Sequence, residues 1–189
     1  TMPAYTVDAK DEAVGKTYYV SSTDGKDTNN GLSENNAFKT LDKINEIKLQ
    51  PGDKVLLEKG SVFENQALHL KGSGSKEAPI EVSVYGEGDR PKINTNGHGQ
   101  WELNYGKHLD NQNHKWKGTV SSSILLEDVE YVEIRGLELT NDRSGNDDEV
   151  NDNEKEYNDP YCMDRTGVAG VAQNKGTIDH IVLDDLYIH

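Results

Sequence analysis

Aromatic side chains gather in one polar stretch of the chain, residues 94–120, where they could bind a sugar. The stretch carries Trp101, Tyr105 and Trp116 among many Asn and Gly residues and few aliphatic ones. Aromatic rings stack on sugar rings, and aromatic residues in a polar loop often mark a binding surface. The same side chains could instead anchor the loop to the body of the protein. The sequence predicts one of these two roles for the three residues and leaves the choice open.

A second polar stretch, residues 141–163, is strongly acidic and is followed by Asp164 and Arg165. Its run of like charges predicts a solvated loop. We expect Asp164 and Arg165 to form an ion pair, or a clamp on this loop at the point where the chain leaves it. Contact with a sugar hydroxyl group is the alternative role for the two residues.

Acidic residues towards the C-terminal end raise the question of glycosidic chemistry. A glycosidase needs two carboxyl groups, about 5–5.5 Å apart in a retaining enzyme and farther apart in an inverting one. Asp184 and Asp185 are adjacent in sequence, and Glu133 or Glu138 could lie near them in a ladder of strands. Acids on the solvent face of a ladder are common, so a polar surface is the simpler interpretation. We assign no catalytic residue within this chain.

The sequence predicts neither a metal site nor a cofactor site. His98, His108 and His114 have a spacing that matches no zinc signature, and no cysteine lies near them. The loop 24–31 has closely spaced acids but lacks the ligand pattern of a calcium-binding EF-hand. The single cysteine, Cys162, cannot form an internal disulfide and is expected to be a small buried residue. No glycine-rich phosphate loop or dinucleotide fingerprint is present.

Composition and charge exclude several classes of protein. The chain has 189 residues, a formal net charge of -14 and only 33% hydrophobic residues. An acidic surface repels phosphate backbones, so nucleic-acid binding is not expected. No run approaches the roughly 20 apolar residues of a transmembrane helix, and the first residues do not resemble a signal peptide. The low hydrophobic content suits a long thin core better than a thick sandwich.

Short strands are the elements that must position these residues. Ile80, Val82 and Val84 alternate with polar residues, which is typical of a strand with one buried face. The segment 131–139 is echoed by the segment 180–188. In this echo Val132, Ile134, Leu137 and Leu139 fall on Ile181, Leu183, Leu186 and Ile188. Repeats of this kind stack coil on coil, so the pattern predicts an all-β fold in the form of a parallel β-solenoid.

A single helix is predicted over residues 38–47. Leu41, Ile44 and Ile47 recur at helical spacing, and Thr40 can cap the helix. A short helix that precedes a ladder of strands can cover the N-terminal end of a solenoid core and its exposed edge. We therefore expect a lead-in over residues 1–16 and N-terminal coils over residues 17–189. The stretches 94–120 and 141–163 are expected to be long loop excursions from these coils.

The last predicted strand, residues 186–188, has no cap after it. A solenoid that ends in mid-coil leaves an unpaired row of backbone groups and an open core. We therefore expect the fold to be incomplete at its C-terminal end. A later segment, or a second polypeptide that completes the solenoid after His189, would cover the strand that ends at Ile188.

Four segments together resemble a known group of proteins. They are Tyr18-Tyr19-Val20, the loop 24–31, Phe38-Lys39-Thr40-Leu41, and Pro51-Gly52-Asp53-Lys54-Val55-Leu56-Leu57. Their order, followed by the Gly72–Ile80 segment, resembles the opening of right-handed parallel β-helix carbohydrate-active enzymes. Within that group the overall texture and the ladder of Ile124–Leu139 and Ile181–Ile188 are most similar to the N-terminal portion of glycoside hydrolase family 136, the lacto-N-biosidases.

This resemblance implies a function that the residues alone do not give. Members of the family would be extracellular or cell-surface bacterial enzymes that release lacto-N-biose from oligosaccharides of the human-milk type, without a cofactor. The family's catalytic aspartates lie on later coils, and some members are assembled from more than one polypeptide. On this basis the chain would supply the cap, the first coils and a wall of the substrate cleft, and would be inactive alone.

Three other functions stay open at the level of sequence. A polysaccharide lyase can use the same scaffold, although it needs a basic residue and a cation to neutralise uronate, and no Lys/Arg cluster is present. A non-catalytic β-solenoid segment of a cell surface, such as a stalk or adhesin, fits the repeat as well. A carbohydrate-binding module is the third alternative, and a change in Trp fluorescence on adding oligosaccharide would reveal it.

Overall fold

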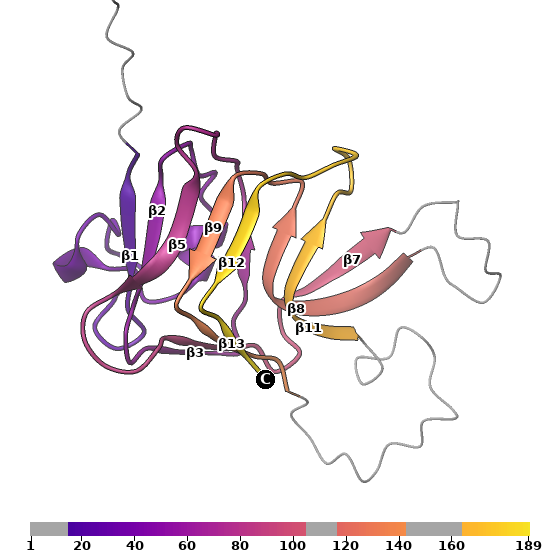
Figure 1. Ribbon diagram of the computed structural model, residues 1–189. Coiled ribbons are helices and arrows are strands. Elements are labelled where there is room, and N and C mark those ends of the chain that lie inside the picture. Colours follow the sequence, from indigo (N-terminus) through magenta and orange to yellow (C-terminus); the bar gives the residue numbers. More distant parts are fainter. Residues whose placement is uncertain (1–14, 105–116, 143–163) are drawn as a thin grey trace, which may run out of the picture.

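The computed structural model describes residues 15–104, 117–142 and 164–189 (Figure 1). Most of the expected lead-in, residues 1–16, therefore lies outside the described residues, as do Tyr105, Trp116 and Cys162. No helix among the described residues is long and apolar enough to cross a membrane.

Strands in three parallel sheets form the body of the protein. The first sheet contains β1 (Thr17–Val20), β2 (Lys54–Glu58), β5 (Ile80–Tyr85), β9 (Val132–Arg135) and β12 (Ile181–Asp184), in that spatial order. The second contains β3 (Val62–Glu64), β6 (Lys92–Asn94), β10 (Glu138–Thr140) and β13 (Tyr187–Ile188). The third contains β4 (Leu68–Leu70), β8 (Lys117–Glu127) and β11 (Asp164–Val171). The prediction of an all-β fold is confirmed.

The chain visits the three sheets in a fixed order and adds one strand to each on every circuit. The first full circuit runs through β2, β3 and β4, the next through β5, β6 and β8, and the third through β9, β10 and β11. The expected echo appears in the strand register. Val132 is paired with Ile181, Ile134 with Leu183, and Leu139 with Ile188. Residues that repeat in the sequence are therefore direct neighbours in space.

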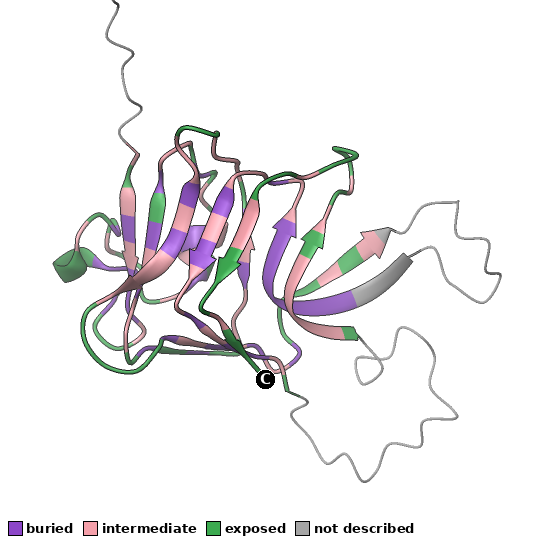
Figure 2. Ribbon diagram, in the orientation of Figure 1, coloured by how far each residue is buried: buried purple, intermediate pink, exposed green. Residues whose placement is uncertain are grey.

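A narrow apolar core lies between the three sheets. In the first sheet, Val55, Val82 and Ile134 form one fully buried row, because each is the register partner of the next. Phe63 and Ile93 form a corresponding row in the second sheet. Buried and partly exposed residues alternate along most strands (Figure 2). Each fully buried aliphatic or Phe side chain contributes roughly 1.5–3 kcal/mol by removal from water.

The helical part of the N-terminal end is shorter than the predicted helix 38–47. The α-helix α1 covers only Asp42–Asn45, and a short 3-10 helix covers Glu34–Asn36. Thr40 does not cap the helix, because both its backbone N–H and its hydroxyl group donate to Asp27 at 2.9 Å. Phe38 instead forms a parallel β-bridge with Val20. The helix still packs against β4, as its predicted covering role requires.

The structure describes only parts of the two predicted excursions, 94–120 and 141–163. Within residues 94–120, β7 (Gln100–Asn104) pairs antiparallel with the first part of β8, which begins at Lys117 rather than Ser121. The two strands project from the body as a hairpin (Figure 1). After the second stretch the ladder resumes at Asp164, the first residue of β11. Residues 143–163 of that stretch lie outside the described residues.

Candidate functional site

A cavity of about 300 Å³ lies beside the third sheet, where α1, the chain before β4 and the hairpin strand β7 meet. We call it the Trp101 cavity. Its size is at the lower end of the range for small-molecule sites, which is roughly 300–1,000 Å³. Side chains that can exchange hydrogen bonds dominate its lining, which includes Asp42, Asn45, Gln66, His69, Trp101 and Ser122.

The antiparallel pairing of β7 with β8 brings Trp101 to this cavity. Trp101 is the register partner of Val120, on a strand that passes close to the chain before β4. Gly99 makes the close approach possible, since a Cβ atom there would lie 2.3 Å from the Cβ of Ala67. Its φ of +63° also favours glycine. The hairpin therefore places the indole ring at the cavity, although the sequence around Trp101 is typical of a polar loop.

The indole nitrogen of Trp101 is the most unusual polar atom of the cavity. Nε1 is buried and has no hydrogen-bond partner, and no other buried side-chain nitrogen or oxygen in the described part of the chain is in this state. An indole N–H can only donate, so it needs an acceptor. Buried polar groups in folded proteins almost always have partners, which makes a bound acceptor a direct explanation.

Two amide side chains of the cavity wall are fixed by the backbone. The Oδ1 atom of Asn45 accepts from the backbone N–H of His69 at 2.7 Å, and its Nδ2 atom donates to the carbonyl of Ala67 at 2.9 Å. The Oε1 atom of Gln66 accepts from the backbone N–H of Leu41 at 2.9 Å. These bonds hold α1 and β4 together and keep the wall of the cavity in one arrangement.

A second hollow, of about 540 Å³, continues along the same face of the third sheet. We call it the His69 groove, because His69 lines it as well as the Trp101 cavity. Its other polar lining residues are Lys48, Lys71, Ser73, Glu127 and Asp128. The His69 side chain faces outward because Leu68 and Leu70 on either side of it are buried in the core.

The His69 imidazole lies 3.7 Å from the Glu127 carboxylate, measured from Nε2 to Oε2. Removal from water lowers the pKa of His69; Glu127 opposes this shift and Lys71 adds to it. The net result is a pKa below the ordinary value near 6.5. His69 is therefore mainly neutral at pH 7, with one ring nitrogen able to donate and the other able to accept.

The acidic residues on the outer faces of the sheets are paired with cations. Asp184 lies 3.2 Å from Arg135, and Asp185 lies 2.7 Å from Arg90. The other two considered from the sequence behave alike, since Glu133 pairs with Arg135 and His180, and Glu138 with Lys92 and His189. Hydrogen bonds from His189 and Lys92 lower the pKa of Glu138. These contacts describe a polar, ion-paired surface.

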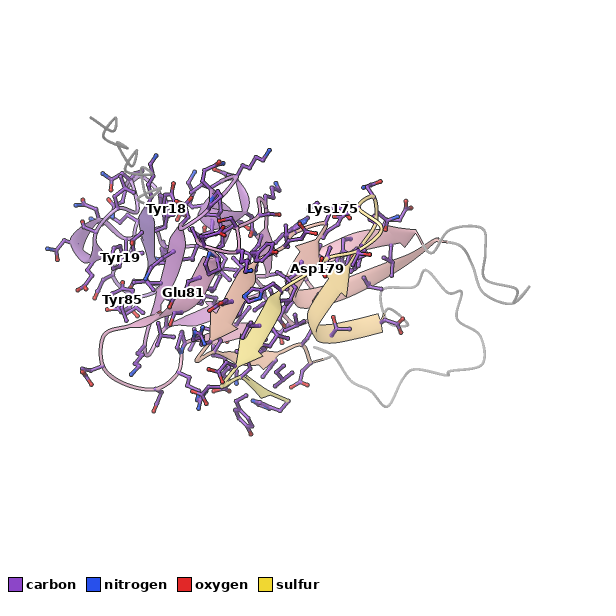
Figure 3. All side chains as sticks on the ribbon, turned by 45° about the horizontal axis from the view of Figure 1, so that its top comes forward. Tyr18, Tyr19, Glu81, Tyr85, Lys175 and Asp179 are labelled. Atoms are coloured by element: carbon purple, nitrogen blue, oxygen red, sulfur yellow. The ribbon has the colours of Figure 1, made fainter. Side chains whose placement is uncertain are left out.

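The first sheet also carries aromatic residues on its outer face. Tyr19 and Tyr85 meet edge to face, with ring centroids 5.2 Å apart (Figure 3). On the same sheet Glu81 pairs with Lys54 at 3.2 Å. Glu81 is also the register partner of Glu133 on the next strand. Cations therefore offset both members of this stacked pair of acids.

Known proteins match nearly the whole chain. A lacto-N-biosidase from Bifidobacterium longum subsp. longum is 46% identical over 192 residues, which cover 93% of this chain and 12% of that protein. Crystal structures of a GH136 lacto-N-biosidase from Eubacterium ramulus, native and as the selenomethionine derivative, are 48% identical with a TM-score of 0.80. They match 92% of this chain and 27% of theirs. The chain is homologous to a segment of glycoside hydrolase family 136. No family model matches it.

The resemblance to family 136 that the sequence motifs predicted is thereby confirmed. The chain spans only 12% and 27% of the lengths of these relatives. The residues from Tyr18 to Leu57, which carried the resemblance to β-helix carbohydrate-active enzymes, lie in the first strands and in the segments that join them. Most of the length of each relative therefore lies outside the part that this chain matches.

The five candidate binding residues have different outcomes in the structure. Trp101 lines the cavity. Tyr105 and Trp116 lie outside the described residues, so their predicted role stays a prediction. Asp164 is exposed at the start of β11, and Arg165 beside it donates to the backbone carbonyl of Asp142. Neither residue lines the Trp101 cavity, and the predicted roles of both stay predictions.

Sequence reasoning missed His69, Asn45 and Gln66. His69 carried a signal, because a histidine between Leu68 and Leu70 in a short strand must face away from the core. Asn45 and Gln66 carried none, since their role depends on the packing of α1 against β4. His98 lines the Trp101 cavity, whereas His108 and His114 lie outside the described residues.

Proposed function

We propose that this chain is part of an extracellular or cell-surface glycoside hydrolase that acts on oligosaccharides and releases lacto-N-biose. The observation that carries the proposal is the 48% identity, with a TM-score of 0.80, to a GH136 lacto-N-biosidase over 92% of the chain. At this identity both the fold and many details of the surface are expected to be shared. The substrate and the extracellular location are what the resemblance to family 136 implies.

We further propose that the three sheets are the N-terminal coils of a right-handed parallel β-helix. The order in which the chain visits the sheets supports this, because each circuit adds a parallel strand to each sheet. A right-handed crossover between parallel strands of one sheet is the strongly favoured hand. In this arrangement α1 covers the N-terminal edge of the third sheet, and the hairpin of β7 and β8 forms a wall beside its outer face.

The catalytic carboxyl groups are proposed to lie outside this chain. A glycosidase general acid needs a raised pKa so that it is protonated at working pH. The described carboxyl groups with a clear pKa shift are Asp27, Asp128 and Glu138, and in each the pKa is lowered. The acids that stack on the outer faces are also neutralised by cations. This segment is therefore assigned a scaffolding and substrate-contacting role.

The strands β12 and β13 support a continuation of the fold. Leu183, Tyr187 and Ile188 on these strands are 46%, 54% and 49% exposed. An apolar strand with unpaired backbone groups favours the addition of another strand. In the proposal, strands from the rest of the enzyme, in the same polypeptide or a second one, cover these residues.

Hydrolysis of a chromogenic lacto-N-bioside tests the proposed function. The complete enzyme that contains this segment is expected to release the chromophore, and the isolated segment is not. Turnover by the isolated segment would overturn the placement of the catalytic groups. No turnover by the complete enzyme, together with release of an unsaturated product from a uronate polymer, would replace the hydrolase by a lyase. Fractionation of the source cells tests the location.

A further inference from the structure

We propose that the Trp101 cavity and the His69 groove form one continuous binding site for a neutral oligosaccharide on the outer face of the third sheet. The site would hold more than one sugar ring. Only the choice of a sugar as ligand rests on the proposed function. The continuity of the site and its preference for a neutral ligand come from the geometry of the described residues.

The two hollows follow one another along the same pair of strands. His69 lines both of them, and its register partner Leu125 on β8 lines the cavity. Ser122 lies in the cavity, and Asp128 lies in the groove. At roughly 3.3 Å per residue, the path from Ser122 to Asp128 is about 20 Å long. A site of this length suits an extended chain of sugar rings better than a single ring.

The charges that line the site favour a neutral ligand. The His69 groove is lined by two positively charged residues, Lys48 and Lys71, and by two negatively charged ones, Glu127 and Asp128. The Asp128 carboxylate is already held by the backbone N–H groups of Asn174 and Lys175, at 2.9 and 3.1 Å. With His69 mainly neutral, the groove offers no net charge to attract an anion. The groove offers hydrogen-bond donors and acceptors, and sugar hydroxyl groups can bind to both.

The Trp101 cavity supplies the apolar contact and an unsatisfied donor. The indole ring offers a flat surface to a sugar ring, and its buried Nε1–H has no acceptor among the described residues. Asn45 and Gln66 are already fixed by backbone hydrogen bonds. Because the walls are ordered before the ligand arrives, binding loses less conformational entropy.

Tryptophan fluorescence offers a specific test. The chain contains two tryptophans, so the Trp116→Phe variant leaves Trp101 as the only reporter. We expect a saturable change in its emission on titration with a neutral tetrasaccharide that ends in lacto-N-biose. His69→Ala in the same background should weaken binding by about tenfold or more, as loss of a central contact residue does. His180→Ala is the matched control and should leave binding unchanged, because His180 pairs with Glu133 on the first sheet.

Calorimetry on the unaltered chain provides a second measurement if the Trp116→Phe variant does not fold. No heat and no fluorescence change up to millimolar tetrasaccharide would overturn the site. Equal affinity for the monosaccharide galactose would overturn its continuity. Tighter, salt-sensitive binding of a sialylated tetrasaccharide would overturn its neutral preference. If the complete enzyme hydrolyses the chromogenic lacto-N-bioside while the segment binds no sugar, this inference fails and the proposed function stands.

Discussion

The side-chain oxygen of Asn45 accepts a hydrogen bond from the backbone N–H of His69 at 2.7 Å. The amide nitrogen of the same side chain donates to the carbonyl of Ala67 at 2.9 Å. The Asn45 side chain thus makes hydrogen bonds to the backbone of the residues before and after Leu68. A neighbouring strand would bond the same backbone groups at the edge of β4. The bond also fixes the backbone of the residue that lines both hollows of the candidate site.

Replacing Asn45 by Ala should destabilise the chain by roughly 1–3 kcal/mol, because it leaves a half-buried donor and a half-buried acceptor of the strand edge without partners. Urea unfolding measures the change. Light scattering should also rise, since an uncovered strand edge can pair with another chain. Asn36→Ala is the control: the Asn36 side chain donates to Ser33 at an exposed position, and its removal should cost under about 0.5 kcal/mol. An equal loss in the free energy of unfolding for the two variants would contradict the role of Asn45 at the edge of β4.

Asp27 should hold the loop before α1 in place. Burial opposes the ionisation of Asp27, but hydrogen bonds from Thr40 and Lys39 outweigh it and keep the pKa of the carboxyl group below its usual value. Asp27→Ala removes three such bonds and should cost about 1 kcal/mol after allowance for solvent exposure. The stability gained through ionisation of Asp27 should be lost as pH falls through its lowered pKa. Asp24→Ala in the same loop is the control for urea unfolding.

Phe63 and Val62 are neighbours on β3 with opposite surroundings. Phe63 is fully buried, whereas Val62 is 44% exposed. Phe63→Ala should lower the free energy of unfolding by about 3–5 kcal/mol through lost burial and the cavity left behind. Val62→Ala should change it by under roughly 0.5 kcal/mol. A small effect of Phe63→Ala in urea unfolding would mean that the space between the sheets is not a close-packed core.

His69 should make the chain sensitive to mild acid. Its pKa is lowered in the folded state, so the unfolded state binds the proton more readily. The stability that depends on neutral His69 is present above the unfolded pKa near 6.5, and it is lost as pH falls below that value. The advantage of the wild type over His69→Gln should therefore shrink between pH 7.5 and 5.5 in urea unfolding.

Glu127→Gln tests the same effect from the other side. Glu127 raises the pKa of His69 against the effect of burial. Without this carboxylate the pKa should fall further, and destabilisation by acid over the same pH range should become steeper. Identical pH profiles for the wild type, His69→Gln and Glu127→Gln would show that His69 is not withdrawn from water.

Local patterns predicted the strands but not all of their ends. The alternation in Ile80–Tyr85 predicted a strand that the structure contains, and the echo of residues 131–139 in residues 180–188 predicted their neighbouring positions. The helix was predicted too long, because Phe38 and Thr40 bond to Val20 and Asp27 rather than to helical neighbours. Such contacts between distant residues override helical spacing.

The sequence by itself determined the all-β class, the stacking of its repeated segments and the relationship to family 136. The first two follow from burial of alternate residues and from the repeat, which act over a few residues or at a constant spacing, whereas the relationship to family 136 rests on resemblance. Tertiary structure alone decided that Trp101, His69 and Asn45 share one cavity. They come from a hairpin, a strand and a helix, and only the pairing of β7 with β8 and the packing of α1 on β4 bring them together. No local sequence pattern predicts that these three residues lie together, because their positions depend on the register and packing of segments distant in sequence.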